Sequence, residues 1–461
     1  MTLASRFAQL RSGFSATFWI ANGLELFERF AYYGSKAVLA VYVAEQVGLG
    51  PEAAGWLVGS LFNTLLYLLP LLAGAVVDRF GFKRSLLACF AIFSVGYFLI
   101  GLAGLPAGQV LVGAIGRKLY MILALVITAA GGSLIKPSIV GTVARTTTDT
   151  TKSLGYSIYY TLVNVGGAIG PFLAVLVRQN LGIAYVLVMS SATTFALILA
   201  TLFFFREPPR PAEAPRATSF AKVLRDAVMV FGNLRFIGFL VIFSGFWIMF
   251  WQIFYSLPFY VRDVLKFERF EIFETIDAWT IILVTVLATA LAKKLRPILA
   301  MTLGFALATC SWFLMIATPP AWAQVAAAPV VAVMNLVLAT LALTGLPATT
   351  MALTPAIAPA AFGLMIFAVG EALQAPRYYE YVADLAPKEQ VGTYMGFAFL
   401  PIAIGTFVAG AISGKLVTHF IQGPGAAAPE RMWIVVGLIG VVSTILMILY
   451  DRLVARRPTT R

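Results

Sequence analysis

Residues 74–84 read GAVVDRFGFKR, a short charged turn between two long apolar runs. Gly81 permits a tight turn at its centre. The flanking runs, 53–77 and 85–104, are each long enough to cross the hydrocarbon core of a bilayer, which needs roughly 20 apolar residues. We therefore predict two membrane helices joined by a cytoplasmic loop, whose charges hold the helix ends together. Those charged residues are Asp78, Arg79, Lys83 and Arg84.

The composition of the whole chain is that of a membrane protein. Of its 461 residues, 60% are hydrophobic and 11% are charged, and the mean hydropathy is +0.90. Soluble domains carry about 25% charged residues, so a cytosolic enzyme, a nucleic-acid binder and a disordered scaffold are excluded. The net charge of +13 comes mostly from Arg and Lys at the ends of apolar runs on alternate loops, as the positive-inside rule predicts. We therefore expect a multi-pass protein of the cell inner membrane with both termini in the cytoplasm, acting as a monomer without a nucleic-acid partner.

The apolar runs predict an all-α polytopic protein with about twelve transmembrane helices in two sets of six. The first set lies near 17–44, 53–77, 85–104, 119–143, 154–177 and 183–205. The second set lies near 236–261, 275–292, 297–318, 360–384, 391–417 and 432–451. This pattern divides the chain into an N-terminal half (1–205), a cytoplasmic linker (206–235) and a C-terminal half (236–461).

Two segments fall outside the twelve spans. The linker begins with a proline-rich stretch, 206–211, and continues with apolar residues at helical spacing from Phe220 to Phe231. This second part predicts an amphipathic helix on the inner membrane surface, and an early start of the seventh span is the alternative. Residues 319–359 are too apolar for a loop in water, and an additional span there would invert the later topology. We expect them to form a hairpin or re-entrant insertion on the outer side.

The first span carries charged residues along one helical face. A charge in mid-span is costly and therefore usually faces a cavity and a partner. At 100° per residue, the polar residues of this span fall within about 60° of one line. A glutamate held among cations has a protonation state that depends on its neighbours, so the stripe predicts a proton-coupling site. A static ion network is the alternative. The stripe consists of Glu25, Glu28, Arg29, Tyr32 and Lys36.

Polar residues in the fourth, fifth and tenth spans add to this candidate site. Lys136 precedes Pro137, which should bend the helix, and it could bind a substrate carboxylate, pair with a glutamate of the first span or snorkel to the inner surface. Arg377 lies nearer the cytoplasmic end of the tenth span and could belong to an inner gate or anchor the helix at the interface. The other candidates for substrate binding are Tyr160, Asn164, Glu371 and Gln374, together with Tyr32 and Lys36 of the first span and Trp251 of the seventh.

Residues typical of catalytic or metal sites are sparse. The single histidine, His419, is expected in a loop, and the two cysteines, Cys89 and Cys310, lie in separate apolar runs. An enzyme would need a nucleophile with its base, or a set of metal ligands. We therefore expect no enzymatic activity, no metal and no cofactor, with a proton gradient as the energy source.

Several motifs resemble those of one transporter family. Residues 25–34, ELFERFAYYG, resemble the ExxERFxYYG motif of the proton-dependent oligopeptide transporter family, and residues 74–84 match the signature loop of the major facilitator superfamily to which that family belongs. Further agreement lies at Ile135-Lys136-Pro137, Tyr159–Gly166, Gly370-Glu371, Leu385-Ala386-Pro387 and Gly392. The resemblance implies the major facilitator fold and uptake of di- and tripeptides driven by an inward proton gradient.

The resemblance also implies roles for individual residues. Glu25, Glu28 and Arg29 would serve proton coupling. Lys136 would serve coupling or bind the peptide carboxylate, and Glu371 would bind the peptide amino group. Lys36 stands where the family usually has arginine, so a cation is retained.

One position departs from the family pattern. Residues 246–252 read FWIMFWQ where the family usually has F-W-x-x-F-E-Q, so Trp251 replaces an acid that could partner Lys36 or Lys136. A cavity with one fewer acid and one more indole favours a more apolar or more anionic substrate. We therefore expect a proton-coupled symporter of di- or tripeptides, or of a related small organic solute, that works by alternating access. A proton-coupled exporter of drugs or metabolites is the alternative.

Overall fold

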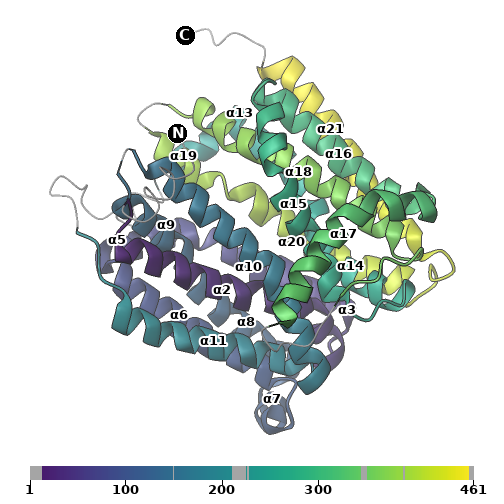
Figure 1. Cartoon of the computed structure of the whole chain (residues 1–461), viewed down its shortest axis with the longest axis horizontal. Helices are drawn as coiled ribbons and strands as arrows, with labels where there is room; N and C mark the ends of the chain where they lie inside the picture. Colours follow the sequence, from purple (N-terminus) through teal and green to yellow (C-terminus); the bar gives the residue numbers. More distant parts are fainter. Residues whose placement is uncertain are drawn as a thin grey trace. The chain divides into compact units, whose positions relative to one another are not determined.

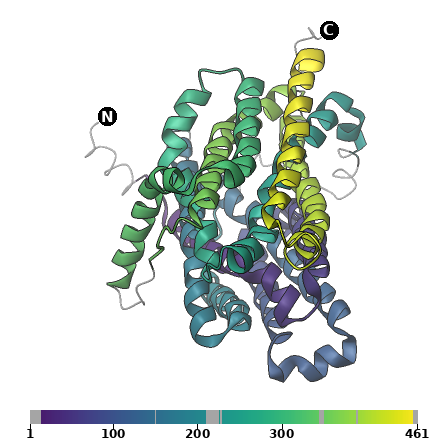
Figure 2. The same ribbon diagram turned by 90° about the vertical axis from the view of Figure 1, so that its right-hand side faces the viewer.

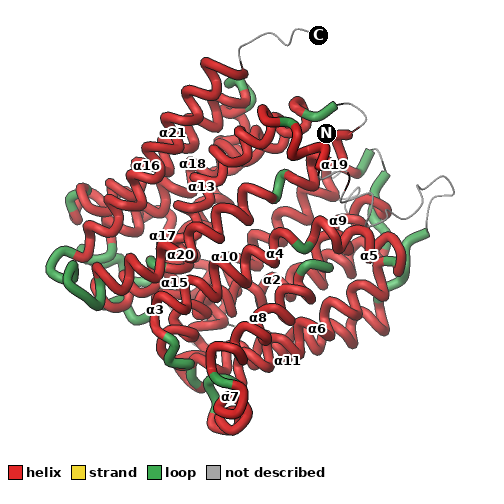
Figure 3. Tube along the Cα trace, turned by 180° about the vertical axis from the view of Figure 1, so that it is seen from behind, coloured by secondary structure: helices red, strands yellow, loops and turns green. Residues whose placement is uncertain are grey.

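A computed structural model describes residues 13–148, 150–209, 225, 228–343, 350–387 and 390–455. In this part of the chain all regular secondary structure is helical, as the red tube of Figure 3 shows. Among these described residues, eleven helices are long and apolar enough to cross a membrane, and the bent pair Gly50–Leu68 with Pro70–Phe80 makes a twelfth when it is counted as one span. The helix α2 (Ala16–Val41) is similarly long but carries the charged stripe. The prediction of an all-α polytopic protein is confirmed.

The contacts within the chain divide it into two compact units. Unit 1 comprises Met1–Lys36 and Leu65–Arg225, and unit 2 comprises Ala37–Thr64 and Asp226–Arg461. The boundary between Arg225 and Asp226 falls within the linker expected from the sequence. The segment 37–64, which by sequence belongs to the first two spans, packs with unit 2.

Unit 1 contains most of the first six spans. Besides most of α2, its long helices are α5 (Pro70–Phe80), α6 (Phe82–Leu102), α8 (Arg117–Gly132), α9 (Ile135–Thr146), α10 (Lys152–Leu181) and α11 (Ile183–Phe204). The helix α6 packs against both α8 and α11 (Figure 1). The helix is interrupted where the bend was expected, because Ser133 and Leu134 separate the end of α8 from the start of α9. Pro137 lacks the N–H that would continue the helical ladder across this break.

Unit 2 contains the remaining spans. Its long helices are α13 (Leu234–Tyr255), α15 (Phe270–Ala292), α16 (Pro297–Ala317), α17 (Pro320–Ala342), α18 (Ala358–Leu385), α20 (Leu400–Phe420) and α21 (Met432–Tyr450). Shorter helical segments in this unit include η1 (Tyr42–Gln46), α3 (Gly50–Ala54), η2 (Gly55–Asn63), η4 (Tyr260–Val264) and α19 (Val391–Phe397). The helix α16 packs against α18 and α21, and α13 packs against α20 (Figure 1).

The apolar insertion expected at 319–359 contains the helix α17. The described chain after α17 returns along it, because Asn335 Nδ2 donates to the Met351 carbonyl at 2.9 Å and Gln324 Nε2 donates to the Leu353 carbonyl at 2.8 Å. Figure 2 shows this helix in green at the left of the view. The stretch Pro320–Thr340 is long and apolar enough to cross a membrane. The placement of this hairpin on the outer side stays a prediction.

Most of the amphipathic helix expected in the linker lies outside the described residues. Residues 228–232 are helical, and Asn233 then interrupts the helix. Asn233 Oδ1 accepts a hydrogen bond from the Phe236 amide at 3.1 Å and so caps α13, as asparagine commonly does. The seventh span therefore begins at Leu234 and is separate from the helical residues of the linker.

Candidate functional site

The charged stripe of α2 forms a buried ion cluster in unit 1. Arg29 Nε lies 2.5 Å from Glu28 Oε2 and 3.4 Å from Glu25 Oε1. Both glutamates are fully buried, and Arg29 is 7% exposed. An ion in such an interior is tolerated only with close partners. One arginine between two glutamates therefore leaves the cluster with an excess negative charge that a further cation must balance.

Lys136 of α9 supplies that cation. Its Nζ lies 4.0 Å from Glu25 Oε1 and donates a hydrogen bond to the Tyr159 hydroxyl at 3.1 Å. The Tyr159 hydroxyl in turn donates to Glu25 Oε1 at 3.3 Å. Glu25 thus links Arg29 on its own helix to Lys136 across a tyrosine. The Lys136 side chain is 37% exposed whereas Glu25 is not exposed at all, so the lysine is the member of the cluster that a solute can reach.

Small residues allow α10 to approach α2 closely at this point. A Cβ atom on Gly166 would lie 2.3 Å from Arg29 Cβ. The backbones of Gly34 and Gly170 also touch, since a Cβ on Gly34 would lie 3.0 Å from the Gly170 carbonyl oxygen. These glycines therefore serve helix packing, as small-xxx-small pairs commonly do.

Each glutamate has one oxygen that can carry a proton. Glu25 Oε2 and Glu28 Oε1 are buried and accept no hydrogen bond from the residues that the structure describes. A neutral carboxylic acid needs one oxygen to bear hydrogen while the other still accepts. Protonation of either side chain is thus compatible with keeping its contact to Arg29.

The other two stripe residues lie beside this cluster. The guanidinium of Arg29 is 4.8 Å from the centre of the Tyr32 ring, within the range of a cation–π contact. Lys36 Nζ lies 5.3 Å from the Tyr33 ring centre and 5.8 Å from that of Tyr32. The helical face predicted from the sequence is therefore a continuous line of cations and rings.

Sequence reasoning favoured Tyr160 over its neighbour Tyr159. In the structure Tyr159 is buried in the ion cluster, whereas Tyr160 is 49% exposed. Asn164 Nδ2 donates to the Tyr160 carbonyl within α10. Tyr159 was missed because the two candidates of this span, Tyr160 and Asn164, lie four residues apart and indicated the adjacent face of the helix.

The predicted site residues of the C-terminal half lie in unit 2. Trp251 is fully buried and stacks on Tyr255, with ring centres 5.4 Å apart and planes 14° apart. Gln374 is 1% exposed, and Glu371, one turn before it on α18, is partly exposed. In this conformation Trp251 is a packing residue of the helix interior, while Glu371 keeps an accessible edge.

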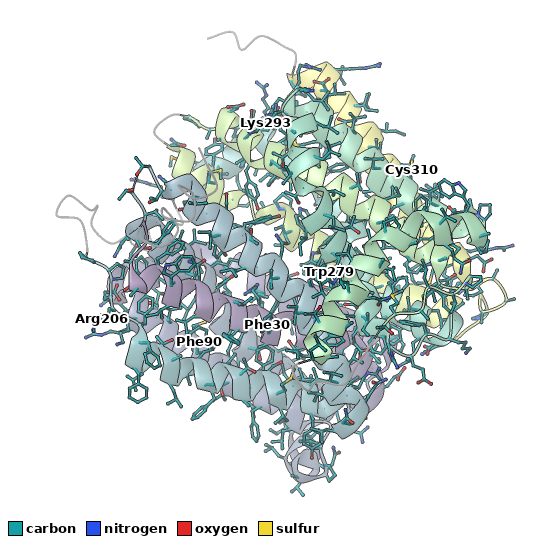
Figure 4. The ribbon with its side chains drawn as sticks, in the orientation of Figure 1. Phe30, Phe90, Arg206, Trp279, Lys293 and Cys310 are labelled. Atoms are coloured by element: carbon teal, nitrogen blue, oxygen red, sulfur yellow. The ribbon has the colours of Figure 1, made fainter. Side chains whose placement is uncertain are left out.

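Arg377 connects three elements at one end of unit 2. Its Nη2 donates to the Leu295 carbonyl between α15 and α16 at 2.6 Å, and its Nη1 pairs with Glu380 on α18. The residue therefore holds the α15–α16 connection, which begins near the labelled Lys293 in Figure 4, onto α18.

Three acids on α15 were not singled out from the sequence. Glu271, Glu274 and Asp277 are all buried and lie three residues apart on adjoining turns. The signal was available as charge at helical spacing. Glu271 and Glu274 fell before the expected start of the eighth span at residue 275, whereas the helix begins at Phe270, and Asp277 alone shows no spacing.

The signature loop is held by a residue that the sequence analysis did not select. Gly81 adopts φ +84°, which confirms the tight turn. The Phe82 and Lys83 amides donate to the two carboxylate oxygens of Glu207 at 2.9 and 2.7 Å, and Lys83 Nζ donates to the Leu202 carbonyl at 3.0 Å. A carboxylate at a helix N-terminus is favourable, so Glu207 ties the start of the linker to α6. Figure 4 labels the adjacent Arg206.

The remaining predictions concern the histidine and the cysteines. His419 lies in the last turn of α20, so its placement in a loop was wrong. Cys89 is buried, and Cys310 is exposed on α16 (Figure 4). Among the described residues no group of three or more His, Cys, Asp or Glu side chains could hold a metal ion.

Comparison with known proteins finds similarity to one superfamily of transporters and to several peptide transporters. A family model described as Major Facilitator Superfamily matches residues 23–368. The di-/tripeptide transporter of Lactococcus lactis subsp. cremoris is 27% identical over 238 residues, which are 48% of this chain and 45% of that protein. Dipeptide and tripeptide permease A of Escherichia coli (strain K12) is 32% identical over 152 residues, which are 32% of this chain and 28% of that protein. The matched regions thus span less than half the length of these relatives.

Solved structures resemble nearly the whole chain. A POT family transporter in complex with 5-aminolevulinic acid superposes with a TM-score of 0.69 at 18% identity, covering 94% of this chain and 96% of the other. A structure described under substrate recognition in proton dependent oligopeptide transporters gives a TM-score of 0.68 at 20% identity, with coverages of 96% and 99%. At this level of identity the likeness establishes a common fold.

Proposed function

Because the chain belongs to the Major Facilitator Superfamily and, by its relatives, to the proton-dependent oligopeptide transporter family within it, we propose that it is a proton-coupled symporter. The fold class and the family resemblance expected from the sequence are confirmed. The proposed cargo is a di- or tripeptide or a related small organic solute, carried by alternating access. The observation that carries this proposal is the ion cluster in which one buried carboxylate oxygen, Glu25 Oε1, lies 3.4 Å from Arg29 Nε and 4.0 Å from Lys136 Nζ.

Proton coupling follows from how the cluster divides its charges. With both glutamates ionised, Glu28 holds Arg29 and Glu25 holds Lys136 through Tyr159. A proton on Glu28 removes one negative charge, so Arg29 turns to Glu25, which is already 3.4 Å away. Glu25 then holds Lys136 less tightly, because one carboxylate is shared by two cations.

The freed lysine is the proposed substrate ligand. Lys136 is the accessible cation of the cluster, and an ammonium group suits a peptide carboxylate as a point charge. Substrate binding and protonation thus favour each other, which is the requirement for symport. Loss of the proton inside would return Arg29 to Glu28 and Lys136 to Glu25, and would release the substrate.

The binding of the other end of the substrate is proposed for unit 2. Glu371 has an accessible edge on α18 and would bind a substrate amino group, with Gln374 one turn further along. Trp251 adds no charge at the position where the family usually has an acid. The missing negative charge favours solutes that are less cationic than a free peptide.

The protein is a multi-pass membrane protein. We further propose that it resides in the cell inner membrane as a monomer, with both termini in the cytoplasm, since basic residues crowd the termini and the linker. No cofactor, metal or enzymatic activity is part of the proposal. The names of the relatives favour a di- or tripeptide cargo over the drugs or metabolites of the alternative.

The test is proton influx into proteoliposomes under an imposed inward gradient. Acidification of the lumen on addition of di- and tripeptides, absent from the Glu28→Gln variant, would support a peptide symporter. A folded protein that gives no signal with any peptide would overturn the peptide assignment. Movement of solute against the direction of proton flow would replace symport by export.

A further inference from the structure

The connection between α15 and α16 brings basic residues of several elements of unit 2 together. Arg377 of α18 donates a hydrogen bond to the Leu295 carbonyl in this connection at 2.6 Å. Arg296 Nη2, at the end of the connection, lies 3.0 Å from Asp451 Oδ2 at the start of η7 (Asp451–Ala455). The connection is therefore fixed between α18 and the end of α21. Its two exposed lysines are Lys293, labelled in Figure 4, and Lys294.

The beginning of α13 reaches the same place. The hydroxyl of Tyr450, the last residue of α21, donates to the Arg235 carbonyl at 3.2 Å, and Arg235 Nη2 lies 3.5 Å from the Ala455 carbonyl oxygen. The Tyr381 hydroxyl of α18 is 3.3 Å from the Tyr450 hydroxyl. Basic side chains thus outnumber acidic ones at this end of unit 2, and we call the set the basic patch. Its basic members are Arg235, Lys293, Lys294, Arg296, Arg377 and Arg452, and its acidic members are Glu380, Asp384 and Asp451.

The patch keeps an excess of accessible positive charge. Asp451 pairs with Arg296, and Glu380 pairs with Arg377. The Arg296 side chain is still 56% exposed, and exposed ion pairs are weak enough for a ligand to compete with them. An anion can therefore reach this surface from outside the helix bundle. The exposed basic side chains are Lys293, Lys294, Arg296 and Arg452.

An apolar surface adjoins the patch directly. The helices α16 and α21 lie side by side (Figure 1) and run antiparallel. Their contacts pass from Arg296 with Asp451 at the patch to Thr309 with Thr444, whose Oγ1 atoms are 3.2 Å apart. The exposed large side chains on the first turns beyond the patch are apolar on both helices. They include Leu299 and Leu303 of α16 and Leu446 and Leu449 of α21.

We propose that the basic patch binds the headgroup of an anionic phospholipid, whose acyl chains lie along α16 and α21. A basic residue close to an anionic lipid surface strengthens binding about fivefold. Within a bilayer the adjoining apolar surface is covered by acyl chains, so a phospholipid is presented to the patch at a high effective concentration. A soluble phosphate has only the charges to bind. The inference uses the membrane class of the protein and is independent of the proposed cargo.

The test measures lipid binding by fluorescence quenching in detergent micelles. In a background with Cys89→Ala and Cys310→Ala, a small fluorophore is attached to Leu303→Cys. This exposed position lies seven residues beyond Arg296, about 10 Å along the helix. Lipids with brominated acyl chains quench the fluorophore where they bind. Half-maximal quenching should need at least about 25-fold less phosphatidylglycerol than phosphatidylcholine, since two accessible lysines each contribute about fivefold.

Removal of the two lysines isolates the charge. The double variant Lys293→Gln/Lys294→Gln should bind phosphatidylglycerol about 25-fold more weakly and leave the binding of phosphatidylcholine unchanged. The matched control is Lys266→Gln/Lys415→Gln, which removes the same charge elsewhere in unit 2. Lys266 precedes α15 and Lys415 lies near the end of α20, whereas the patch adjoins the end of α15. This control should keep the full preference for phosphatidylglycerol.

Three outcomes would overturn the proposal. Equal quenching by the two lipids in the parent protein would show that the patch selects no headgroup. A preference that survives Lys293→Gln/Lys294→Gln, in protein that elutes as a folded species, would place the lipid elsewhere. Displacement of phosphatidylglycerol by an equal concentration of inorganic phosphate would show that the patch binds free anions and that the apolar surface adds nothing.

Discussion

Replacement of Glu28 by glutamine isolates the proton-binding step in the proposed mechanism. Glutamine keeps the shape of the side chain and an oxygen for Arg29, but it carries no charge and binds no proton. Glu28 Oε2 lies 2.5 Å from Arg29 Nε. Two unit charges about 4 Å apart at an effective dielectric constant of 20 interact by about 4 kcal/mol. Glu25, 3.4 Å from the same nitrogen, recovers part of this energy.

The variant should therefore fold and remain fixed in the arrangement that protonation produces. Uptake driven by a proton gradient should fall by at least about 100-fold, which corresponds to ~2.7 kcal/mol of lost coupling. Counterflow exchange of substrate, which needs no net proton movement, should stay within about threefold of the wild-type rate. Both rates are measured with labelled substrate in the same proteoliposomes.

Glu430→Gln provides the matched control, since this glutamate lies in the connection before α21 and outside the cluster. It should leave both rates unchanged. Gradient-driven uptake by Glu28→Gln at the wild-type rate would refute the reasoning, because the carboxylate would then carry no coupling proton. Loss of exchange together with uptake would show that Glu28 is needed for the structure of the cluster.

Three further substitutions test the packing around the site. Gly166→Ala would place a Cβ 2.3 Å from that of Arg29 and should lower the free energy of unfolding by about 1–3 kcal/mol. This loss is measured as a lower melting temperature in detergent. Gly74→Ala is the control, because nothing lies within 4 Å of a Cβ at that position, and it should melt like the wild type. Tyr159→Phe removes the hydroxyl that joins Lys136 to Glu25. Gradient-driven uptake should fall about tenfold, as loss of a charge-assisted hydrogen bond of ~1.5 kcal/mol implies. Unchanged uptake would show that Tyr159 has no part in proton coupling. Trp251→Glu would bury a carboxylate in a fully buried aromatic site and should lower the free energy of unfolding by several kcal/mol. Trp251→Phe should lower it by about 1 kcal/mol. Equal melting temperatures of the two variants would contradict this packing.

The substitution of Trp251 for an acid has a structural explanation in this chain. The Trp251 indole is fully buried and stacks on Tyr255, whose hydroxyl forms hydrogen bonds with Asn63 and Thr406. A charged side chain at the same place would have to be desolvated beside an aromatic ring. The change of residue and the neutral hydrogen-bond junction are therefore compatible parts of one interior.

The sequence by itself determined the features that depend on spacing along one helix. The stripe from Glu25 to Lys36 follows from 3.6 residues per turn, whatever the helix packs against. The tight turn at Gly81 and the break before Pro137 follow from local backbone preferences. The membrane class follows from the cost of burying charge in lipid, which is a property of composition.

Only the tertiary structure decided which side chains meet across helices. Tyr159 rather than Tyr160 reaches Lys136, because the approach of α10 at Gly166 fixes the rotation of that helix. Glu207 caps α6 from a position more than 120 residues away. Such contacts depend on how helices are rotated and how closely they approach, and neither quantity is encoded in the period of a single helix.

The assignment of residues 37–64 to unit 2 also depends on contacts between helices. By sequence these residues complete the first two spans, and contacts such as that of Gly59 with Gly410 and the hydrogen bond from Asn63 to Tyr255 show where they pack. Glycines at a helix contact produce no hydrophobic pattern in the sequence, because they stabilise the contact by letting the backbone of the neighbouring helix come close. Local periodicity therefore specified the helices and their charged face, and close approach between helices decided the ion cluster and the packing of segment 37–64.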